Sequence, residues 1–357
     1  MGTVNWPLAA PAPEDMRWIR VEDPSAAAAC RAAGVALATR LRFPAARAAE
    51  LALAVTEAAT NLHKHAREGM LMLRISRADG KPGIELVTID GGPGVAATSA
   101  ALRDGHSTSG SLGIGLGAIA RLADYSDLWS VPGHGTVLAA RFWPEPGRTA
   151  SGTRGITVPY AGLIRPMSGE TECGDNFGAI GTSRQGQDGL TLTGVLCDGL
   201  GHGPLAAIAA TAAISAVLED PDREPAALVE RAHRQMSRTR GGALGVAQIT
   251  SGNNGSGGSV VFAGLGNITA TLLSPGQRKN MLSVPGIAGH QARAIRQFQY
   301  DLPAGASAVL HSDGISGRWN AGALAGLSGR DPLVIAAAIL AEAGMHRDDA
   351  GILVLKP

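Results

Sequence analysis

Three polar residues recur at every fourth position of an alanine- and leucine-rich segment. Glu57, Asn61 and His65 lie within residues 44–66, where Pro44 suits the first turn of a helix and apolar residues follow at helical spacing. Residues four apart share one face of a helix, so the three side chains are expected to project together. Such a face is either a candidate site or a solvated polar stripe, and the pattern alone leaves both interpretations open.

Two glycine-rich motifs follow the polar stripe. The sequence Asp-Gly-Gly-Pro-Gly (90–94) comes directly after an apolar, strand-like run, and Gly-Ser-Leu-Gly-Ile-Gly-Leu-Gly (110–117) lies between a Ser/Thr-rich loop and a helical pattern. Glycines there let backbone N–H groups approach a phosphate, and a helix N-terminus favours an anion. Each motif alone is weak, because Asp-Gly and Gly-rich stretches are ordinary turns.

The order and spacing of the three motifs are more informative than any one of them. ExxxN on a helix, DxGxG after a strand and then GxGLG resemble the N, G1 and G2 boxes of the GHKL ATPases, and Gly135-Thr136 fits the later Gly-Thr element of that family. The form ExxxNxxxH resembles the RsbT/RsbW type of small serine kinases and anti-sigma factors. The resemblance covers nearly all of residues 15–143 and implies an α/β sandwich.

The resemblance implies roles for residues of the polar stripe. Asn61 would bind Mg²⁺ between the phosphates of ATP, and Glu57 would be the general base that takes the proton of an attacking serine hydroxyl. His65 would either orient Glu57 or cap the helix face. Both roles of His65 stay open.

The glycine motifs acquire roles from the same resemblance. Asp90 would accept a hydrogen bond from the adenine amino group, Gly92 and Gly94 would let the base lie close to the backbone, and Thr136 would support the adenine side. The lid and phosphate loop would contain Gly113, Gly115 and Gly117.

A second set of acidic motifs occupies the other half of the chain. Several Asp-Gly pairs follow apolar, strand-like runs, and strand ends in a sandwich can bring carboxylates together. Oxygen ligands suit hard cations such as Mg²⁺ and Mn²⁺, and two such ions can activate a water against a phosphate ester. The motifs are Cys173-Gly174-Asp175, Asp198-Gly199-Leu200-Gly201-His202-Gly203, Gly264-Leu265-Gly266-Asn267, Ser312-Asp313-Gly314 and Arg347-Asp348-Asp349.

This series resembles the PPM metal-dependent serine/threonine phosphatases, specifically the SpoIIE/RsbX branch, over about residues 157–357. By that resemblance Asp198 would bridge two metal ions and the carbonyl of Gly199 would bind one of them. Asp313 and Asp348 would complete the other site, and Asp175 matches the family's early acidic position. Asp313 and Asp198 are therefore also the expected catalytic residues of this half.

Other residues near these motifs are candidates for supporting roles. His202 either donates to the substrate phosphate or is structural, Asp349 aligns with a position behind the metal ligands, and His311 is expected to be a core histidine. Glu170 and Glu172 could also approach the metals. The sequence has no clear counterpart of the phosphate-binding Arg of eukaryotic relatives, for which the candidates are Arg165, Arg184 and Arg318.

Composition limits the remaining classes. The chain has 357 residues, 45% of them hydrophobic, and a net charge of +1, which excludes a disordered chain and argues against nucleic acid as the main partner. The longest uncharged apolar run, 204–218, is shorter than the ~20 residues of a membrane span. Cys30, Cys173 and Cys197 form no CxxC pair, so neither a disulfide framework nor a zinc site is expected, and a cytoplasmic location is expected.

The pattern along the chain predicts two domains. Residues 1–143 would form a GHKL α/β sandwich, 144–155 a Pro/Gly/Ser/Thr-rich linker, and 156–357 a PPM-type α/β/β/α sandwich. The predicted helices are 25–42, 44–66, 113–123, 204–218 and 225–238. The predicted strands are 16–22, 70–77, 84–89, 126–131, 136–142, 190–197, 243–249, 259–263, 269–273, 308–311 and 351–355.

Both resemblances together imply a bifunctional regulator of bacterial partner switching. The N-terminal domain would use ATP·Mg²⁺ to phosphorylate a STAS-type antagonist protein, and the C-terminal domain would use Mg²⁺ or Mn²⁺ to dephosphorylate that protein or a related one. In the alternative, the N-terminal domain is an ATP-gated clamp that binds a sigma factor or another partner without kinase turnover, and only the phosphatase is catalytic. Related kinases often dimerise, so a homodimer is compatible with either interpretation.

Overall fold

The computed structural model describes residues 14–78, 81–95, 112–145, 158–183, 190–251, 257–319, 324 and 326–357. They form two compact units, Pro13–Val158 and Pro159–Pro357, called here the N-terminal and the C-terminal unit. The predicted linker lies largely outside the described residues, so the predicted domain boundaries stay a prediction.

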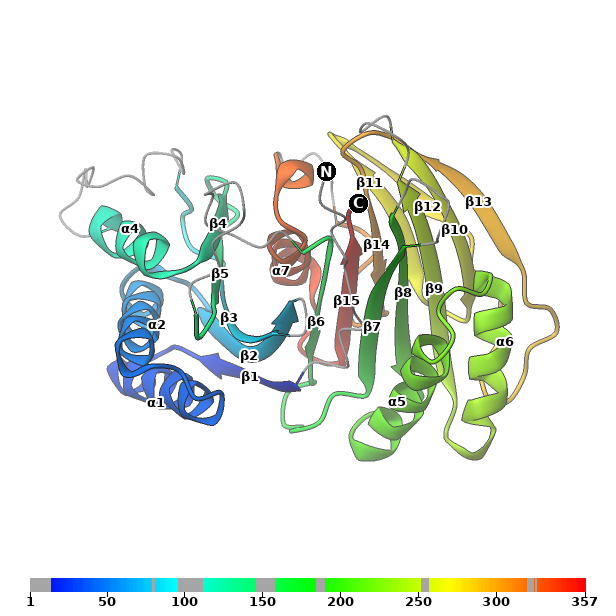
Figure 1. The fold of residues 1–357 in the computed structure, drawn as a ribbon, viewed down its shortest axis with the longest axis horizontal. Helices are drawn as coiled ribbons and strands as arrows, with labels where there is room; N and C mark the ends of the chain where they lie inside the picture. The colour runs from blue at the N-terminus through cyan, green and yellow to red at the C-terminus, as the bar shows by residue number, and fades with distance from the viewer. Residues whose placement is uncertain are drawn as a thin grey trace. The chain divides into compact units, whose positions relative to one another are not determined.

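The N-terminal unit is an antiparallel sheet with helices packed on one face (Figure 1). The strand order is β1-β2-β3-β5-β4. The strands are β1 (Glu14–Arg20), β2 (Met70–Ala78), β3 (Lys81–Asp90), β4 (Tyr125–Ser130) and β5 (Thr136–Phe142). The helices are α1 (Pro24–Arg40), α2 (Ala45–His65) and α4 (Leu112–Leu122).

Alternation along the strands separates the two faces of this sheet. Leu71 and Leu73 of β2 and Leu86 of β3 belong to the same apolar core as Leu51 and Val55 of α2. The intervening residues project from the other face. This arrangement fixes which side of α2 is buried and leaves the polar stripe at the edge of the core.

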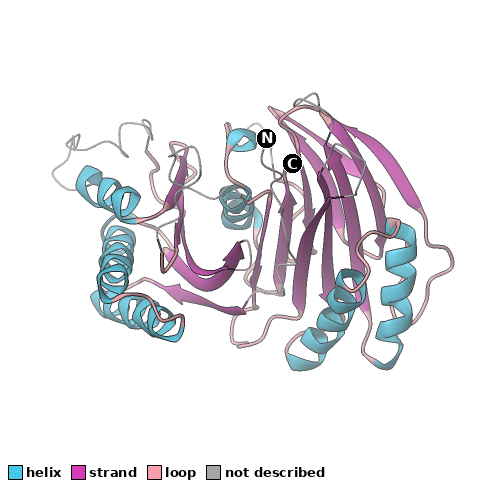
Figure 2. Ribbon diagram, in the orientation of Figure 1, coloured by secondary structure: helices cyan, strands magenta, loops and turns pink. Residues whose placement is uncertain are grey.

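The C-terminal unit is a sandwich of two antiparallel five-stranded sheets with helices outside both (Figure 2). One sheet has the order β13-β10-β9-β8-β7 and the other β12-β11-β14-β15-β6. The strands of the first are β7 (Asp175–Ser183), β8 (Leu190–Gly199), β9 (Gly242–Ser251), β10 (Gly258–Leu265) and β13 (Gln297–Leu302). The strands of the second are β6 (Tyr160–Arg165), β11 (Thr269–Ser274), β12 (Gln277–Met281), β14 (Ser307–His311) and β15 (Ala350–Leu355).

Helices complete the layers of this sandwich. Helices α5 (Pro204–Leu218) and α6 (Pro225–Gln235) pack on the first sheet, and α7 (Pro332–Ala343) packs on β6 and β15 of the second. Two short 3-10 turns, Met236–Arg238 and Leu327–Gly329, connect elements. The α/β/β/α order confirms the predicted fold class.

The sequence pattern missed several elements. The structure adds β6, β7, β12, β13 and α7 to the predicted set. Every residue of α7 from Pro332 to Leu340 is buried, so this helix has no polar face and no helical period to read. Strand β7 contains two glycines and β12 is mostly polar, which hides both from a search for apolar alternation.

Candidate functional sites

The predicted polar stripe meets the first turns of α4. Gly115 of α4 has no side chain, and a Cβ built there would lie 2.9 Å from Nδ2 of Asn61, 3.1 Å from Oδ1 of Asn61 and 3.1 Å from Oε2 of Glu57. Two polar side chains of α2 therefore converge on one bare stretch of α4 backbone. The structure brings Glu57, Asn61 and Gly115 together, as expected if they share a site.

A pocket of about 460 Å³ opens beside this point. It lies between α2, α4 and the sheet, so it has one helical wall and one strand wall. Its lining is apolar with a few polar side chains, the usual character of a small-molecule site. The lining residues are Ala58, Asn61, Leu62, His65, Thr88, Asp90, Val95, Leu116, Thr136 and Leu138.

Two polar atoms at this pocket lack partners. Nδ2 of Asn61 and Nε2 of His65 are buried and form no hydrogen bond within the described structure. Burial, with the nearby charge of Lys64, lowers the pKa of His65 and so favours the neutral ring. Because a buried polar atom without a partner is costly, these atoms fit a ligand with hydrogen-bonding groups. Nε2 of His65 does not bind Glu57.

Asp90 sits at the strand wall of the pocket. Burial raises its pKa to about 6, although hydrogen bonds from the backbone amides of Gly92 and Thr136 act in the opposite direction. The Gly92 amide donates to Oδ1 of Asp90 at 2.7 Å. Ser130 Oγ lies 3.0 Å from Thr136 Oγ1 and donates to the Gly135 carbonyl, so the Thr136 hydroxyl is held at the mouth of the same strand pair.

Glycine is required where the backbone passes closest to Asp90. Gly94 has φ +69° and Gly135 has φ +80°, and a Cβ at Gly135 would lie 1.7 Å from the Asp90 carbonyl oxygen. At Gly92 a Cβ would lie 2.7 Å from the carboxylate itself.

Gly113, Gly115 and Gly117 lie in helix α4, which agrees with the predicted helix 113–123. Their role in the lid and phosphate loop stays a prediction. A helix forms there because Leu112, Leu116 and Ile119 recur at helical spacing. Residues 96–111, where the preceding loop was predicted, lie outside the described residues.

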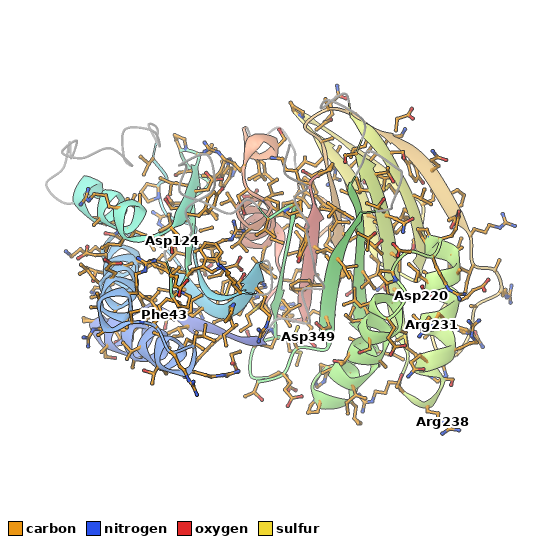
Figure 3. The ribbon with its side chains drawn as sticks, viewed as in Figure 1. Phe43, Asp124, Asp220, Arg231, Arg238 and Asp349 are labelled. Carbon is orange, nitrogen blue, oxygen red and sulfur yellow. The ribbon has the colours of Figure 1, made fainter. Side chains whose placement is uncertain are left out.

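In the C-terminal unit, strand register brings the acidic residues together. Asp175 of β7 and Asp198 of β8 are direct partners across the antiparallel pair. Phe177 and Leu196, two residues away on each strand, belong to the core between the sheets, so both carboxylates project toward that interior. Asp349 (labelled in Figure 3) directly precedes β15 of the facing sheet and accepts a hydrogen bond from Gly174, which directly precedes β7. It therefore lies at the same end of the sandwich as Asp175.

Asp349 and Asp175 are held by hydrogen bonds. Oδ1 and Oδ2 of Asp349 accept from the backbone amides of Met167 and Gly174, both at 2.8 Å. The hydroxyl of Ser312 donates to Oδ2 of Asp175 at 2.6 Å and accepts from the Gly351 amide at 2.9 Å. These contacts fix the two most buried carboxylates of the cluster.

Asp313 and Asp348 occupy the more open side. The side-chain amide of Asn267 donates to Oδ2 of Asp313 at 2.6 Å, and Oδ1 of Asp348 accepts from the Asp349 amide at 2.9 Å. Asn267 belongs to the predicted GxGN motif, so its position is a clue that the sequence contained, whereas nothing in the sequence distinguished Ser312 from an ordinary turn residue.

The cluster has an excess of negative charge. Burial, followed by the charges of Asp313, Asp348 and Asp349, raises the pKa of Asp198 to about 8. Burial and the charge of Asp198 raise the pKa of Asp175 well above its usual range, and burial with Asp313 raises that of Asp348. Carboxylates arranged in this way favour bound cations.

The spacing of the carboxylates is wide. Within the described ranges, no three acidic, histidine or cysteine side chains stand close enough together to hold one metal ion. The donor set is entirely oxygen and fits Mg²⁺ or Mn²⁺.

Glycines bring the backbone close to these acids. A Cβ at Gly199 would lie 2.2 Å from the Ala206 carbonyl oxygen, and one at Gly314 would lie 1.8 Å from the Asp349 carbonyl oxygen. The first turn of α5 and the Asp-Gly turns can therefore pack directly against the cluster.

His202 has an acidic partner. Its Nδ1 lies 2.8 Å from Oε1 of Glu170, and the His202 side chain is 55% exposed. This pairing leaves Nε2 of the ring for solvent or substrate. Glu170 was expected to approach the metals, and in the structure it contacts His202.

The three candidate phosphate-binding arginines differ in position and exposure. Arg165 is buried and its Nη2 donates to the Met345 carbonyl at 3.0 Å. Arg184 lies outside the described residues. Arg318 is exposed in the turn after β14. His311 is buried, as expected of a core histidine, and its Nδ1 lies 2.9 Å from the Ser312 carbonyl.

The fold and the two sites define a chain that joins a GHKL-type nucleotide-binding domain to a PPM-type metal-dependent domain. Residues 21–142 match the family described as "Histidine kinase-like ATPase domain", and residues 188–356 match "Stage II sporulation protein E (SpoIIE)". The serine/threonine-protein kinase RsbT of Bacillus subtilis (strain 168) is 36% identical over 115 residues, which are 32% of this chain and 86% of RsbT.

Two solved structures resemble part of this chain. A crystal structure of RsbX with magnesium is 18% identical, with a TM-score of 0.44, and the match covers 55% of this chain and 94% of that one. The PP2C phosphatase domain of SpoIIE from Bacillus subtilis, with a fragment of its regulatory domain, is 14% identical, with a TM-score of 0.42 and coverage of 79% and 81%.

The chain belongs to the RsbT family of histidine kinase-like ATPases through its N-terminal unit and carries a SpoIIE domain after it. It therefore combines an RsbT-like serine/threonine kinase domain with a SpoIIE-type serine/threonine phosphatase domain, and the two predicted resemblances are confirmed. No helix among the described residues is long and apolar enough to span a membrane.

Proposed function

We propose that the two domains act in opposite directions on a STAS-domain antagonist protein in bacterial partner switching. The N-terminal unit phosphorylates a serine or threonine of this partner with ATP, and the C-terminal unit removes the phosphate from the same or a related partner. The observation that carries the proposal is the presence of both side-chain sets in one chain: Glu57 and Asn61 converge on Gly115, and the aspartates gather at one end of the sandwich. Opposing activities in one chain give each a high local concentration for a shared partner.

In the N-terminal unit, the pocket residues divide between the base and the phosphates. Asp90, Gly92, Gly94 and Thr136 hold the adenine, and Asn61 provides an oxygen for Mg²⁺. The α4 backbone at Gly113, Gly115 and Gly117 faces the phosphates. ATP·Mg²⁺ supplies the phosphoryl group and compensates its charge.

Glu57 acts as the general base of the kinase. Its carboxylate lies beside Asn61 and takes the hydroxyl proton of the partner's serine or threonine as that oxygen attacks. His65, with a neutral ring and an unpaired Nε2 at the pocket, binds the nucleotide.

In the C-terminal unit, the aspartates hold the metal ions and the neighbouring polar residues hold the aspartates. Asp175, Asp198, Asp313 and Asp348, with the carbonyl of Gly199, would hold the ions. Divalent cations, Mg²⁺ or Mn²⁺, supply charge compensation and water activation when bound. His202, oriented by Glu170, donates a proton to the departing serine or threonine oxygen.

Location and assembly follow from this role. Partner switching between soluble regulators places the protein in the cytoplasm, and a homodimer formed through the kinase-type domain is compatible with it. The domain boundaries that best suit the proposal are 1–143 and 156–357, joined by a linker at 144–155.

The kinase half is tested with γ-³²P-ATP, Mg²⁺ and a purified STAS-domain protein. Glu57→Gln is expected to slow labelling ~10²–10⁴-fold, the usual contribution of a general base, and to leave nucleotide affinity nearly unchanged. Glu50→Gln, on the same helix and paired with Arg47, is the matched control. Labelling that survives Glu57→Gln contradicts the assignment, and a stable complex with a partner or sigma factor without transfer supports the ATP-gated clamp.

The phosphatase half is tested with Mn²⁺ and two substrates, p-nitrophenyl phosphate and a phosphorylated STAS-domain protein. The wild type is expected to hydrolyse both, and Asp198→Ala is expected to hydrolyse neither. Asp301→Asn, an exposed change on β13, controls for loss of surface charge. Failure of the wild type on both substrates overturns the assignment.

A further inference from the structure

Three exposed aliphatic side chains lie close together in the sequence, just before and within the first turns of α5. Leu200 is 51% exposed, Leu205 53% and Ile208 56%. Leu205 and Ile208 are three residues apart on α5, so they share a face. Large hydrophobic side chains that cluster on a surface mark interaction sites more often than single ones do. We call these three residues the rim patch.

The rim patch adjoins the acidic cluster. Leu200 immediately follows Asp198 and Gly199, and its amide donates to the Gly241 carbonyl at 2.9 Å. Between Leu205 and Ile208, Ala206 packs so closely that a Cβ at Gly199 would lie 2.2 Å from its carbonyl oxygen, and one at Gly174 would lie 2.9 Å from its Cβ. The inner side of α5 thus touches the metal-binding turns while its outer side carries the patch.

A positive charge borders the same loop. Nη1 of Arg240 lies 3.0 Å from the position of a Cβ on Gly201. The Arg240 guanidinium makes no ion pair with any residue in the described part of the chain, although the carboxylate cluster begins three residues before Gly201. An apolar patch beside a cation without an ion-pair partner complements a ligand whose surface is apolar and carries a negatively charged group next to the apolar part.

We propose that the rim patch docks the protein substrate of the phosphatase, covering the folded surface around its phosphorylated serine or threonine. This inference rests on the proposed phosphatase function. A phosphoserine side chain is short, so a folded protein that places its phosphate at Asp198 must cover the loop at Leu200. The phosphate brings negative charge to the side where Arg240 lies, and apolar residues around the phosphorylated site lie against Leu205 and Ile208.

The experiment compares a protein substrate with a small one. The variant Leu205→Gln/Ile208→Gln keeps the local charge and the helix propensity of α5. The control is Leu282→Gln, because Leu282 is 61% exposed on the same unit and lies outside the patch. The probes are p-nitrophenyl phosphate and a STAS-domain protein carrying ³²P-phosphoserine, labelled beforehand by a separate kinase.

The double variant is expected to lose ~10-fold or more in kcat/KM toward the phosphoprotein, as for two apolar contacts at an interface centre. Its hydrolysis of p-nitrophenyl phosphate is expected to stay within about twofold of wild type, as is the activity of Leu282→Gln on both probes, because neither change reaches the ligands. Equal losses on both probes overturn the proposal, since the patch then supports the loop alone.

Other results also overturn it. An unchanged phosphoprotein rate shows that the substrate does not cover the patch. Conversion of a wild-type dimer to a monomer by the double variant, measured by sedimentation velocity, assigns the patch to a second copy of this chain. Binding of wild type, but not the variant, to phosphatidylglycerol vesicles assigns it to a lipid surface. If wild type hydrolyses neither probe, the proposed phosphatase function fails and not the docking surface alone.

Discussion

The two units treat buried carboxylates in opposite ways. In the N-terminal unit, Glu85 is bound by two guanidinium groups: Arg141 Nε at 2.8 Å from Oε1 and Arg74 Nε at 2.6 Å from Oε2. Burial alone would raise the pKa of Glu85, but the charges of Arg74 and Arg141 prevail and hold it at about 2. In the C-terminal unit, Asp175 and Asp198 face each other across paired strands, and their pKa values rise.

This difference indicates what each unit requires from its ligand. Away from the pocket, the N-terminal unit pairs its buried acids Glu85 and Asp124 with arginines. The atoms without a partner at the pocket belong to an amide and a neutral imidazole, those of Asn61 and His65. This unit therefore selects a ligand by shape and hydrogen bonds. The C-terminal unit has positioned its acids with amides and hydroxyls that carry no positive charge, so it requires cations.

The largest expected effect comes from Asp349→Ala, which removes the hydrogen bonds that position the acidic cluster. Asp349 is 3% exposed and accepts hydrogen bonds from two loops, at Met167 and Gly174. Its loss leaves both amides without this partner and is expected to lower the free energy of unfolding of the C-terminal unit by about 3 kcal/mol. Urea denaturation followed by circular dichroism measures the change.

Asp348→Ala is the control for Asp349→Ala. Asp348 is more exposed and accepts only the amide of its own neighbour. Removing it relieves repulsion from Asp313 and Asp349, so the metal-free unit is expected to be as stable as wild type or more so. If both changes destabilise the unit equally, Asp349 does not position the cluster in a way that Asp348, the proposed metal ligand, does not.

The sequence located the acids but not what holds them. Asp198 and Asp313 could be predicted because each follows an apolar run, and strand ends meet in a sandwich, whereas Asp175 was predicted only from the family resemblance. Their register, and therefore the direct pairing of Asp175 with Asp198, depends on β7, whose glycines at 178 and 181 conceal the strand. The hydrogen bonds from Ser312 to Asp175 and from the Met167 amide to Asp349 join segments far apart in the chain, which no local pattern reveals.

The same limit applies to the nucleotide site. Helical spacing predicted that Glu57, Asn61 and His65 share a face, and the structure shows Glu57 and Asn61 meeting α4 at Gly115. That meeting is a tertiary contact between two helices, so the sequence could not distinguish it from a solvated stripe. Helix α7 was missed because its residues from Pro332 to Leu340 are apolar and buried on every side, so they carry no periodic signal.

A smaller effect is expected from Gly115→Ala in the N-terminal unit. The new methyl group would lie 2.9–3.1 Å from polar atoms of Asn61 and Glu57, so both side chains must move. We expect ~10-fold weaker binding of ATP·Mg²⁺, about one lost polar contact. Helix propensity favours Ala over Gly by about 1 kcal/mol, so thermal stability should not fall in parallel. Isothermal titration calorimetry and thermal unfolding measure the two quantities.

Gly34→Ala provides a matched change in the same unit. Gly34 also lies inside a helix, α1, and its new methyl group would lie 3.3 Å from Cγ2 of Val55, away from the pocket. It is expected to leave nucleotide affinity unchanged. Weaker ATP binding in both variants would assign the loss at Gly115 to general distortion of the unit.

The smallest expected effect, and the one that most directly contrasts stability with binding, is the pH dependence caused by Asp90. Burial raises the pKa of this carboxyl from 3.8 to about 6, so the contribution of Asp90 to stability is fully present below 3.8 and is lost as pH rises through about 6. Nucleotide binding runs the other way, because the ionised carboxylate is the better acceptor for the adenine amino group. At pH 5 only about a tenth of the Asp90 carboxyl groups are ionised, so ATP should bind up to ~10-fold more weakly than at pH 7.5.

Asp90→Asn is the control, because the variant side chain cannot titrate in this pH range while the ionisation of ATP is the same for both proteins. The ratio of wild-type to variant affinity therefore isolates the effect of Asp90. A ratio that is constant from pH 5 to pH 7.5 contradicts contact between Asp90 and the base, whereas a ratio that rises through pH 6 while the ligand-free unit loses stability places the titrating group in the nucleotide pocket.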